Sequence, residues 1–566
     1  MTFHLRPFSF CGGKGVEIAL YGADAVRADR PESVTLSLCA RHAGAPCASG
    51  DVCDGVSVEL RGGSPASLRL RRGVCARRDL FYAVRPDRVI VSDRFAHVIR
   101  ALPAAERGPC PAAVTDHFMF RAVTPPRTYC RNILRVVGGG VVEISLADGA
   151  VRESDGQRLP QRAMRARGED HAAHVAEALH AAMRRSAHED AALLFSGGVD
   201  SALLAALAPD MPLAHSMLDS AEFAEEVAYA DSAAAALGRR FDTRTLSEEA
   251  FPGRLTDVVD RIGAPPHHAV TLLIDHAMET PHPVCVSGAE ADLLFGFGHG
   301  PDLAAAAALS GPAGRAALAG LSHVLRGHYA GRLATVRRMA QMMAAPLDAP
   351  RGFGLGMRQP GLLAFMTRTF GAEAVTGALR DRATLAERAG FRIPPGPATP
   401  ARHIATTQMV NWLSSDTGGV WTQVALSRGK TLRLPFADPL VVTEALRIPE
   451  ALRYRRGLAV KHVLKTALAR CAPDYHRNQR KLGGSLPILR LVEEGPLRDV
   501  FERFAPPEFL SMADMTQTAR RYPRLLWHSV TFAVWRARLA AWPQTAEGPG
   551  PTLMLASPAP CAATPT

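Results

Sequence analysis

The first 160 residues contain short runs in which apolar and polar residues alternate. These runs cover residues 56–60, 67–70, 80–84 and 89–92, and turn-forming pairs such as Pro86-Asp87 separate them. Alternation with a period of two, bounded by turn residues, predicts β-strands with one buried face. A short helix near 115–120 and a strand over 141–145, after three consecutive glycines, complete a predicted β-rich region.

The pattern changes after a polar, Arg-rich linker at residues 160–172. Residues 174–185 have helical spacing, and residues 191–195 form a fully apolar run that suits a strand buried on both faces. Helices are then predicted over 202–207 and 225–237, and strands over 213–217 and 241–246. This alternation predicts a parallel sheet with crossover helices, and a ligand at the carboxyl ends of its strands.

Length and composition fit a chain of several domains. At 566 residues it is too long for one ordinary core, and we divide it into residues 1–165, residues 172–542 and a Pro- and Ala-rich tail at 543–566 that we expect to be disordered. Residues 300–400 are rich in Ala, Leu and Arg and predict helices. The Ala-rich stretch 304–325 contains Gly311-Pro312 and Arg315, which favours a helical pair over a membrane span.

The net charge of +12 favours an anionic ligand such as ATP. The charges are spread along the chain without a Lys/Arg block, so we expect no nucleic-acid partner. We also expect no membrane partner and a cytoplasmic protein, because the N-terminus lacks the apolar segment of a signal peptide. The ten cysteines form no Cys-x-x-Cys pair, which argues against structural zinc. Small buried or surface thiols are the expectation, although seven cysteines before residue 131 leave a redox or disulfide role open.

Residues 191–207 predict a strand, a glycine turn and a helix, with the sequence Ser-Gly-Gly-Val-Asp-Ser at 196–201. Gly197 and Gly198 lack a Cβ, so backbone N–H groups there are accessible to an anion, and the helix directs its positive end at the same point. Ser196 and Ser201 add hydroxyl donors, and the Asp200 carboxylate suits Mg²⁺. No Gly-Lys-Ser/Thr follows the turn, so this is not a Walker motif.

The segment 196–201 resembles the PP-loop of ATP pyrophosphatases. A second strand–turn–helix pattern ends in Ser-Gly-Ala-Glu-Ala-Asp-Leu-Leu-Phe-Gly at 287–296, which resembles the asparagine synthetase signature Ser-Gly-Glu-Gly-Ala-Asp-Glu-Leu-Phe-Gly. The chain is therefore similar to the asparagine synthetase-like family. The resemblance implies that Asp200 and Asp292 hold Mg²⁺ on the phosphates of ATP, where a cation offsets the charge of departing pyrophosphate.

The resemblance extends to two lysines. Residues 458–465 are similar to a Lys-x-x-Leu-Arg helix of the family, and residues 480–487 to a loop whose lysine approaches the adenylate. It implies that Lys461 and Lys481 stabilise charge at the α-phosphate. The same resemblance implies an ATP site made by nine residues: Phe195, Ser196, Gly197, Gly198, Asp200, Ser201, Met217, Ser287 and Gly288. For Met217 and the two lysines, plain core and surface positions stay open as alternatives.

Two acid/base positions depart from the family. Ala289 stands where asparagine synthetases have Glu and β-lactam synthetases have Tyr, and Thr431 stands where the family has Glu in the motif at 431–438. Glu290, one residue later, is a candidate replacement base. Pro265-Pro266 precedes His267 and His268, for which we expect neutral surface or capping roles, since no third metal ligand is evident.

The N-terminal region resembles a degenerate Ntn-type glutamine amidotransferase domain. The family's glutaminases use an N-terminal Cys nucleophile with its own amine as base. Here position 2 is Thr2 and the first cysteine, Cys11, is internal, so we expect no glutaminase activity. The expected fold is therefore α/β, with this β-rich domain followed by a PP-loop synthetase domain that has a parallel sheet and extra helices.

The resemblance implies an AMP-forming carbon–nitrogen ligase with ATP and Mg²⁺ as cofactors. An asparagine-synthetase-like body, no glutaminase and a divergent acceptor site resemble a lasso-peptide cyclase, which closes a macrolactam between an Asp or Glu side chain and the N-terminal amine of a precursor peptide. The implied partners are that peptide, a leader-peptide protease and a leader-binding partner. Three alternatives stay open: a small-molecule amide synthetase of the β-lactam or asparagine type, a PP-loop tRNA-modifying enzyme, and a non-catalytic scaffold.

Overall fold

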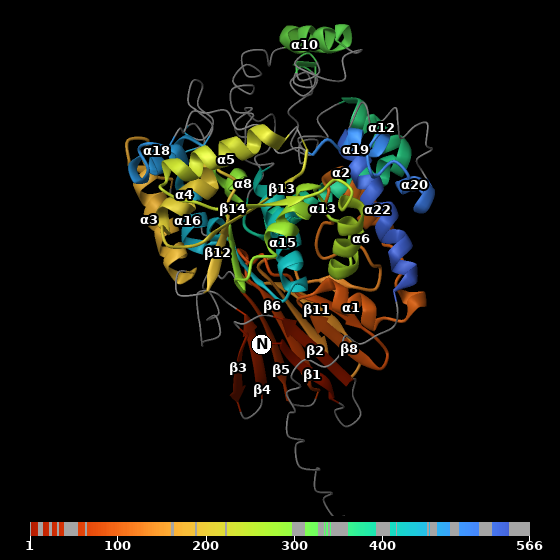
Figure 1. The fold of residues 1–566 in the computed structure, drawn as a ribbon. Helices are drawn as coiled ribbons and strands as arrows, with labels where there is room; N and C mark the ends of the chain where they lie inside the picture. The colour runs from red at the N-terminus through yellow and green to blue at the C-terminus, as the bar shows by residue number, and fades with distance from the viewer. Residues whose placement is uncertain are drawn as a thin grey trace, which may run out of the picture.

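The β-strands of the N-terminal third lie in the lower half of the molecule in Figure 1, and most helices lie above them. The computed structural model describes residues 2–8, 15–21, 25–30, 33–38, 55–62, 65–159, 164–186, 190–220, 223–296, 312–325, 360–391, 408–414, 416–449, 461–475, 486–508 and 523–542, and the single positions 333, 336, 337, 340 and 452. Lys481, Cys11 and residues 543–566 lie outside these ranges.

Two sheets in the N-terminal region pack through one shared apolar layer. Residues on β5 and β6 alternate between buried and half-buried, so each strand turns one face inward. Val58, Leu70, Ile18 and Val91 meet in that layer. The first sheet has the order β1 (Thr2–Phe8), β2 (Gly15–Tyr21), β8 (Arg88–Ser92), β7 (Phe81–Val84), β9 (Leu134–Arg135), and the second β11 (Val151–Asp155), β10 (Gly140–Ser145), β6 (Ser67–Arg72), β5 (Val56–Arg61), β4 (Ser33–Leu38), β3 (Ala25–Arg30).

The C-terminal region contains a parallel sheet, which confirms the prediction from alternating strands and helices. Every described pair in this sheet is parallel, and β12 has four fully buried residues, as its apolar run predicts. The order is β14 (Asp242–Leu246), β13 (Leu213–Leu218), β12 (Ala191–Leu194), β15 (Val284–Ser287), β16 (Thr431–Arg433).

Helices precede and follow the strands of this sheet along the chain. Those that follow or flank its strands are α3 (His171–Ser186), α4 (Val199–Leu207), α5 (Ala224–Ala236), α6 (Phe251–Ile262), α7 (Val270–Ala277), α8 (Ala291–Phe295), α15 (Asp416–Ser427), α16 (Pro439–Arg447) and α18 (His462–Cys471). Other described helices include α1 (Phe95–Ala101), α2 (Pro111–Phe120), α10 (Pro312–Val324), α12 (Pro360–Phe370), α13 (Ala372–Arg388), α19 (Ile488–Glu493), α20 (Val500–Arg503) and α22 (Pro523–Ala541). Within the described ranges, no helix has the length and apolar character needed to cross a membrane.

One hydrophobic core joins the two regions. Phe95 of α1 and Phe118 of α2 belong to the same buried cluster as the strands of the parallel sheet and as Trp535 of α22. Polar contacts cross the same boundary: the Gln423 amide accepts a bond from Phe95 N–H at 3.0 Å and donates to the Asp93 carbonyl at 2.7 Å. The N-terminal helices thus fix the β-rich region onto the synthetase-like region.

Several element boundaries differ from the predicted ones for local reasons. Helix α2 begins at Pro111 rather than 115, because proline is well tolerated at the first helical position. Helix α4 begins at Val199 with Gly198 as its N-cap, so Asp200 lies in the first turn, where a carboxylate interacts favourably with the helix dipole. Strands β1 to β4 and helices α1 and α6 had no separate prediction. For β3 the reason is local, since Ala25–Arg30 carries three charged residues and little apolar periodicity.

Candidate functional site

The two glycine turns lie side by side at the carboxyl ends of β12 and β15. The parallel register pairs Leu194 with Ser287, so the loops that follow these residues leave the same edge of the sheet. A Cβ added to Gly288 would lie 3.1 Å from the Cβ of Asp200 and 3.2 Å from the backbone nitrogen of Ser201. The absence of a side chain at Gly288 therefore allows the second loop to approach the start of α4.

The first loop is shaped by its own glycine and serines. Gly197 has a φ of +68°, and a Cβ there would lie 2.7 Å from the Cα of Ala230, so this position requires glycine. The Ser201 hydroxyl donates to the Gly198 carbonyl at 3.1 Å and accepts from Ser196 N–H at 3.2 Å. The buried Ser201 hydroxyl thus donates its hydrogen bond within the loop, while the Ser196 side chain is exposed.

Tyr475, which follows α18, holds this loop by a hydrogen bond to its backbone. The sequence did not indicate this residue, because no local motif surrounds it. Its hydroxyl donates to the Gly197 carbonyl at 2.6 Å and lies 3.1 Å from the Tyr229 hydroxyl, which therefore acts as a donor to it. Burial raises the pKa of Tyr475, so the phenol keeps its proton. In a trans peptide the C=O and N–H groups point in opposite directions, so this bond turns the Gly198 N–H away from Tyr475.

Three predicted site residues converge as charged groups. The Lys461 ammonium forms ion pairs with Asp200 and with Asp292, which come from the two loops. Lys461 caps α18 with a left-handed backbone, at φ +57°. Burial acts to lower the pKa of Lys461, but the two carboxylates outweigh burial and raise it, so the ammonium stays charged.

The two carboxylates fit a magnesium ion. Both reach one ammonium nitrogen, so both are within reach of one cation at that place, and carboxylate oxygens are ligands that Mg²⁺ prefers. Across the described ranges, no group of three or more His, Cys, Asp or Glu side chains could hold a metal by itself. Two carboxylates suit a Mg²⁺ ion that completes its coordination with water and nucleotide phosphate oxygens.

Glu290 has a different environment from these carboxylates. Its side chain is fully buried, Oε1 accepts from Gly418 N–H at 2.8 Å, and Oε2 lies 3.6 Å from Arg77 Nε. The backbone at Glu290 is left-handed, at φ +77°. The structure thus places Glu290 between the two regions of the chain, and its role as a replacement base stays a prediction.

The remaining predicted positions have mixed environments. The Phe195 ring is buried against Phe241, so only its backbone is at the loop. Met217 is half-buried against the main core, and its predicted adenine contact stays a prediction. The Ser287 hydroxyl is buried and accepts from Ala289 N–H at 3.2 Å. Thr431 is buried at the first residue of β16, the strand next to β15.

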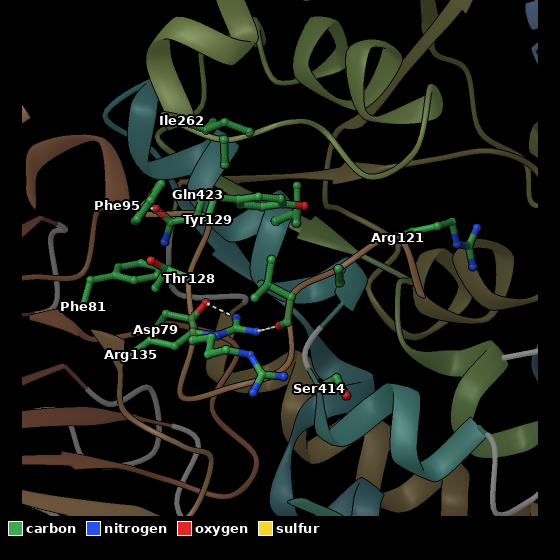
Figure 2. A pocket seen from close by; sticks show the side chains of 16 residues that line it. Asp79, Phe81, Phe95, Arg121, Thr128, Tyr129, Arg135, Ile262, Ser414 and Gln423 are labelled. Carbon is green, nitrogen blue, oxygen red and sulfur yellow. Dashed lines mark hydrogen bonds and ion pairs between the residues drawn. The ribbon is translucent and has the colours of Figure 1, made fainter. Parts of the chain in front are cut away.

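A cavity of about 70 Å³ lies between the two regions of the chain. Apolar side chains such as Phe81, Phe95 and Val420 form much of its wall, and the ion pair of Asp79 with Arg135, at 3.4 Å, closes one side, as Figure 2 shows. None of the predicted site residues belongs to its lining. The cavity is therefore separate from the place where Asp200, Asp292 and Lys461 meet.

His267, His268 and the buried cysteines make contacts typical of structural residues. His268 Nδ1 accepts from Val270 N–H at 3.2 Å, which confirms a capping role at α7. The expected surface position is wrong for His267, which is 3% exposed and has its Nε2 3.3 Å from the Thr417 hydroxyl of α15. Burial raises the pKa of Cys130 and of Cys285 to about 11, so both stay protonated thiols. The described cysteines are free.

Comparison with known proteins agrees with this geometry. A family model described as asparagine synthase matches residues 174–536, more than half of the chain. The chain belongs to the asparagine synthase family. The asparagine synthase match begins within α3 and ends within α22, so both glycine loops and the three charged residues lie inside it.

Curated relatives are more distant. Putative asparagine synthetases described as glutamine-hydrolyzing, from Mycobacterium bovis and from two strains of Mycobacterium tuberculosis, are 25% identical over 367 residues. The matched part is 60% of this chain and 53% of each relative, so the chain spans about half the length of the curated relatives it matches.

Proposed function

We propose that this asparagine synthase family member is an AMP-forming ligase that uses ATP to join a carboxylate to an amine. The observation that carries the proposal is the convergence of Asp200, Asp292 and Lys461 beside two glycine loops at the carboxyl edge of a parallel sheet. Ligands of open α/β sheets bind at that edge, and a helix N-terminus with accessible N–H groups suits phosphate.

In the first step, a carboxylate oxygen of the acceptor attacks the α-phosphorus of ATP, and the bond from that phosphorus to the bridging oxygen of pyrophosphate breaks. Gly198 N–H and the first turn of α4 bind the phosphates, and Lys461 stabilises the negative charge that collects on pyrophosphate. Asp200 and Asp292 would hold Mg²⁺, which supplies Lewis-acid stabilisation of the same charge.

In the second step, the amine attacks the acyl carbon, AMP leaves with both electrons of the acyl–oxygen bond, and the amine loses a proton. The chain's contribution is to keep the two reactants next to each other and away from water. This order of steps needs no ammonia from glutamine when the substrate itself carries the free amine.

The acceptor we propose is a precursor peptide whose Asp or Glu side chain is joined to its own N-terminal amine, as in a lasso-peptide cyclase. Support comes from Ala289 and Thr431, which stand at two positions where the resemblance implies acid/base residues and which cannot act as acids or bases themselves. A leader-peptide protease and a leader-binding partner would supply the free amine. A second candidate is asparagine or another small-molecule amide synthesis, which the names of the curated relatives favour.

The test uses the purified full-length protein with MgATP and a core-type peptide that has a free N-terminus and an internal Asp or Glu. Mass spectrometry follows the peptide, and AMP and pyrophosphate are measured in parallel. A peptide that loses one water with equimolar AMP supports the cyclase. AMP release with free aspartate and ammonia or glutamine, and none with peptides, supports the second candidate. Absence of AMP with every acceptor and with the protease and partner added contradicts the ligase.

A further inference from the structure

A buried ion pair joins the N-terminal region to the beginning of α8. Arg77 lies in the loop between β6 and β7, and Glu290 is the residue that caps α8. Arg77 Nε and Glu290 Oε2 are 3.6 Å apart, and their side chains are only 5% and 0% exposed. Buried charges of this kind cost free energy unless they are paired, so the ion pair stabilises both side chains.

The loop that carries Arg77 is held firmly from within its own domain. The fully buried Arg72 guanidinium donates to the Ala76 carbonyl at 3.0 Å and to the Arg78 carbonyl at 3.2 Å, and lies 3.1 Å from an Asp79 oxygen. Arg77 is therefore presented by a fixed backbone. Its guanidinium carbon also lies 3.8 Å from the centre of the buried Trp412 ring, a cation–π arrangement.

The partner carboxylate is fixed equally closely. Gly418 N–H, at the start of α15, donates to Glu290 Oε1 at 2.8 Å. A Cβ at Gly418 would lie 2.4 Å from that oxygen and 2.8 Å from Arg77 Cδ, so only glycine fits against the pair. Glu290 has a left-handed backbone, and α8 begins at the next residue, so the side chain that makes these contacts precedes Asp292 in the first turn of the helix.

Asp292 lies two residues after Glu290, in the first turn of α8. We propose that Arg77 is a positioning residue that acts through Glu290 to fix Asp292, so that the N-terminal domain sets the affinity of the synthetase site for Mg²⁺ with ATP. This inference rests on the proposed function. It gives the N-terminal domain a role that requires no glutamine hydrolysis, because the domain serves as the rigid support for one metal-binding loop.

The test measures ATP binding to the full-length protein by calorimetry over a series of Mg²⁺ concentrations and in EDTA. Arg77→Met keeps the length and apolar contact on Trp412 but removes the charge. We expect the Mg²⁺ concentration for half-maximal ATP binding to rise about tenfold, the lower end of the range for residues that support metal ligands. ATP binding in EDTA should change by less than about twofold, since Asp292 acts through the metal.

The matched control is Arg107→Met. Arg107 is also a fully buried arginine that crosses between the two regions, where it donates to the Trp542 carbonyl at 2.7 Å, but it has no contact with α8 among the described interactions. This variant should lose thermal stability without a change in the Mg²⁺ requirement. Arg77→Lys, which restores a charge at the pair, should recover part of the lost affinity.

The outcomes separate the two claims. If the wild-type protein binds no ATP at any Mg²⁺ concentration, the proposed function fails and this inference fails with it. If the wild type binds MgATP and Arg77→Met has the same Mg²⁺ requirement, or differs only in melting temperature, the inference alone is overturned. Should Arg77→Met not fold, Glu290→Gln keeps the acceptor for Gly418 N–H, removes the charge opposite Arg77, and must raise the Mg²⁺ requirement in the same way.

Discussion

The ammonium of Lys461 forms an ion pair with the carboxylate of Asp200, 261 residues earlier in the chain. The same ammonium meets Asp292 of the second glycine loop. Two carboxylates that face one site repel each other unless a cation lies between them, and in this structure the cation is the lysine. Lys461 thus neutralises the two carboxylates in this structure. When a magnesium ion binds, Lys461 must leave the carboxylate oxygens that coordinate the ion.

Replacing Lys461 by Met is expected to make the protein depend on Mg²⁺ for stability. Without the ammonium, Asp200 and Asp292 lose their counterion, so the melting temperature in EDTA should fall below that of the wild type. Added Mg²⁺ should restore most of the loss, because binding to the folded state alone stabilises it. Differential scanning calorimetry with and without Mg²⁺ measures this, and equal Mg²⁺ responses of the two proteins would contradict it.

Replacing Asp292 by Asn should reduce pyrophosphate release from ATP by about 100-fold or more, since a preorganised charge that stabilises the transition state is typically worth that much. The amide keeps the shape of the side chain but is a poorer magnesium ligand. Asp210→Asn, at an exposed turn, is the matched control and should retain full activity. A retained rate in Asp292→Asn would remove this carboxylate from the site.

The glycine loops and their carboxylates could be predicted from sequence because each forms a local pattern. A buried strand, a glycine turn and a helix place each of Asp200 and Asp292 at the carboxyl end of its own strand, and the pairing of β12 with β15 brings the two ends together. Lys461 could be named only through the family resemblance, since its contacts are made by residues far away in the sequence.

Other parts of the site have no sequence signal. Tyr475 and Arg77 belong to no motif, and their partners, Gly197 and Glu290, are reached only through the tertiary fold. Glu290 also shows why a one-residue shift matters. The left-handed backbone at this residue turns its carboxylate into the contact with Arg77 and Gly418, a direction that spacing alone does not indicate.

Tyr475→Phe should weaken ATP binding with little loss of stability. The variant removes one hydrogen bond, which fixes the Gly197 carbonyl and with it the direction of the Gly198 N–H. A neutral hydrogen bond contributes about 1 kcal/mol, so we expect a KM for ATP about fivefold higher. Tyr229→Phe, which keeps the bond to Gly197, should have a smaller effect. An unchanged KM in Tyr475→Phe would show that the loop keeps its geometry without this anchor.

Stability should fall on acidification because of His117. This histidine is fully buried, its Nε2–H donates to the His528 carbonyl at 3.1 Å, and its Nδ1 accepts from the Tyr129 hydroxyl at 2.9 Å. Burial lowers its pKa from 6.5 to about 4. Between those values the unfolded chain binds the proton and the folded chain does not, so stability is full above about pH 6.5 and is lost as the pH falls toward 4.

From pH 7.5 to 5 this linkage amounts to about 2 kcal/mol. Urea unfolding of the wild type and of His117→Gln across this range measures it, and the variant should show a correspondingly shallower pH dependence. His323→Gln, at an exposed position on α10, should keep the wild-type slope. Parallel slopes for His117→Gln and the wild type would contradict the assignment.

The central claim is that this chain activates a carboxylate by transfer of the adenylyl group of ATP. Transfer of a heavy oxygen isotope from the carboxylate to AMP tests this claim most directly. A core-type peptide with labelled side-chain carboxylate oxygens is incubated with the protein and MgATP, and the AMP is examined by mass spectrometry. The account predicts that each AMP carries one labelled oxygen, because the attacking carboxylate oxygen stays on the phosphorus when the amide forms. Formation of AMP without label, or of ADP in its place, would contradict it.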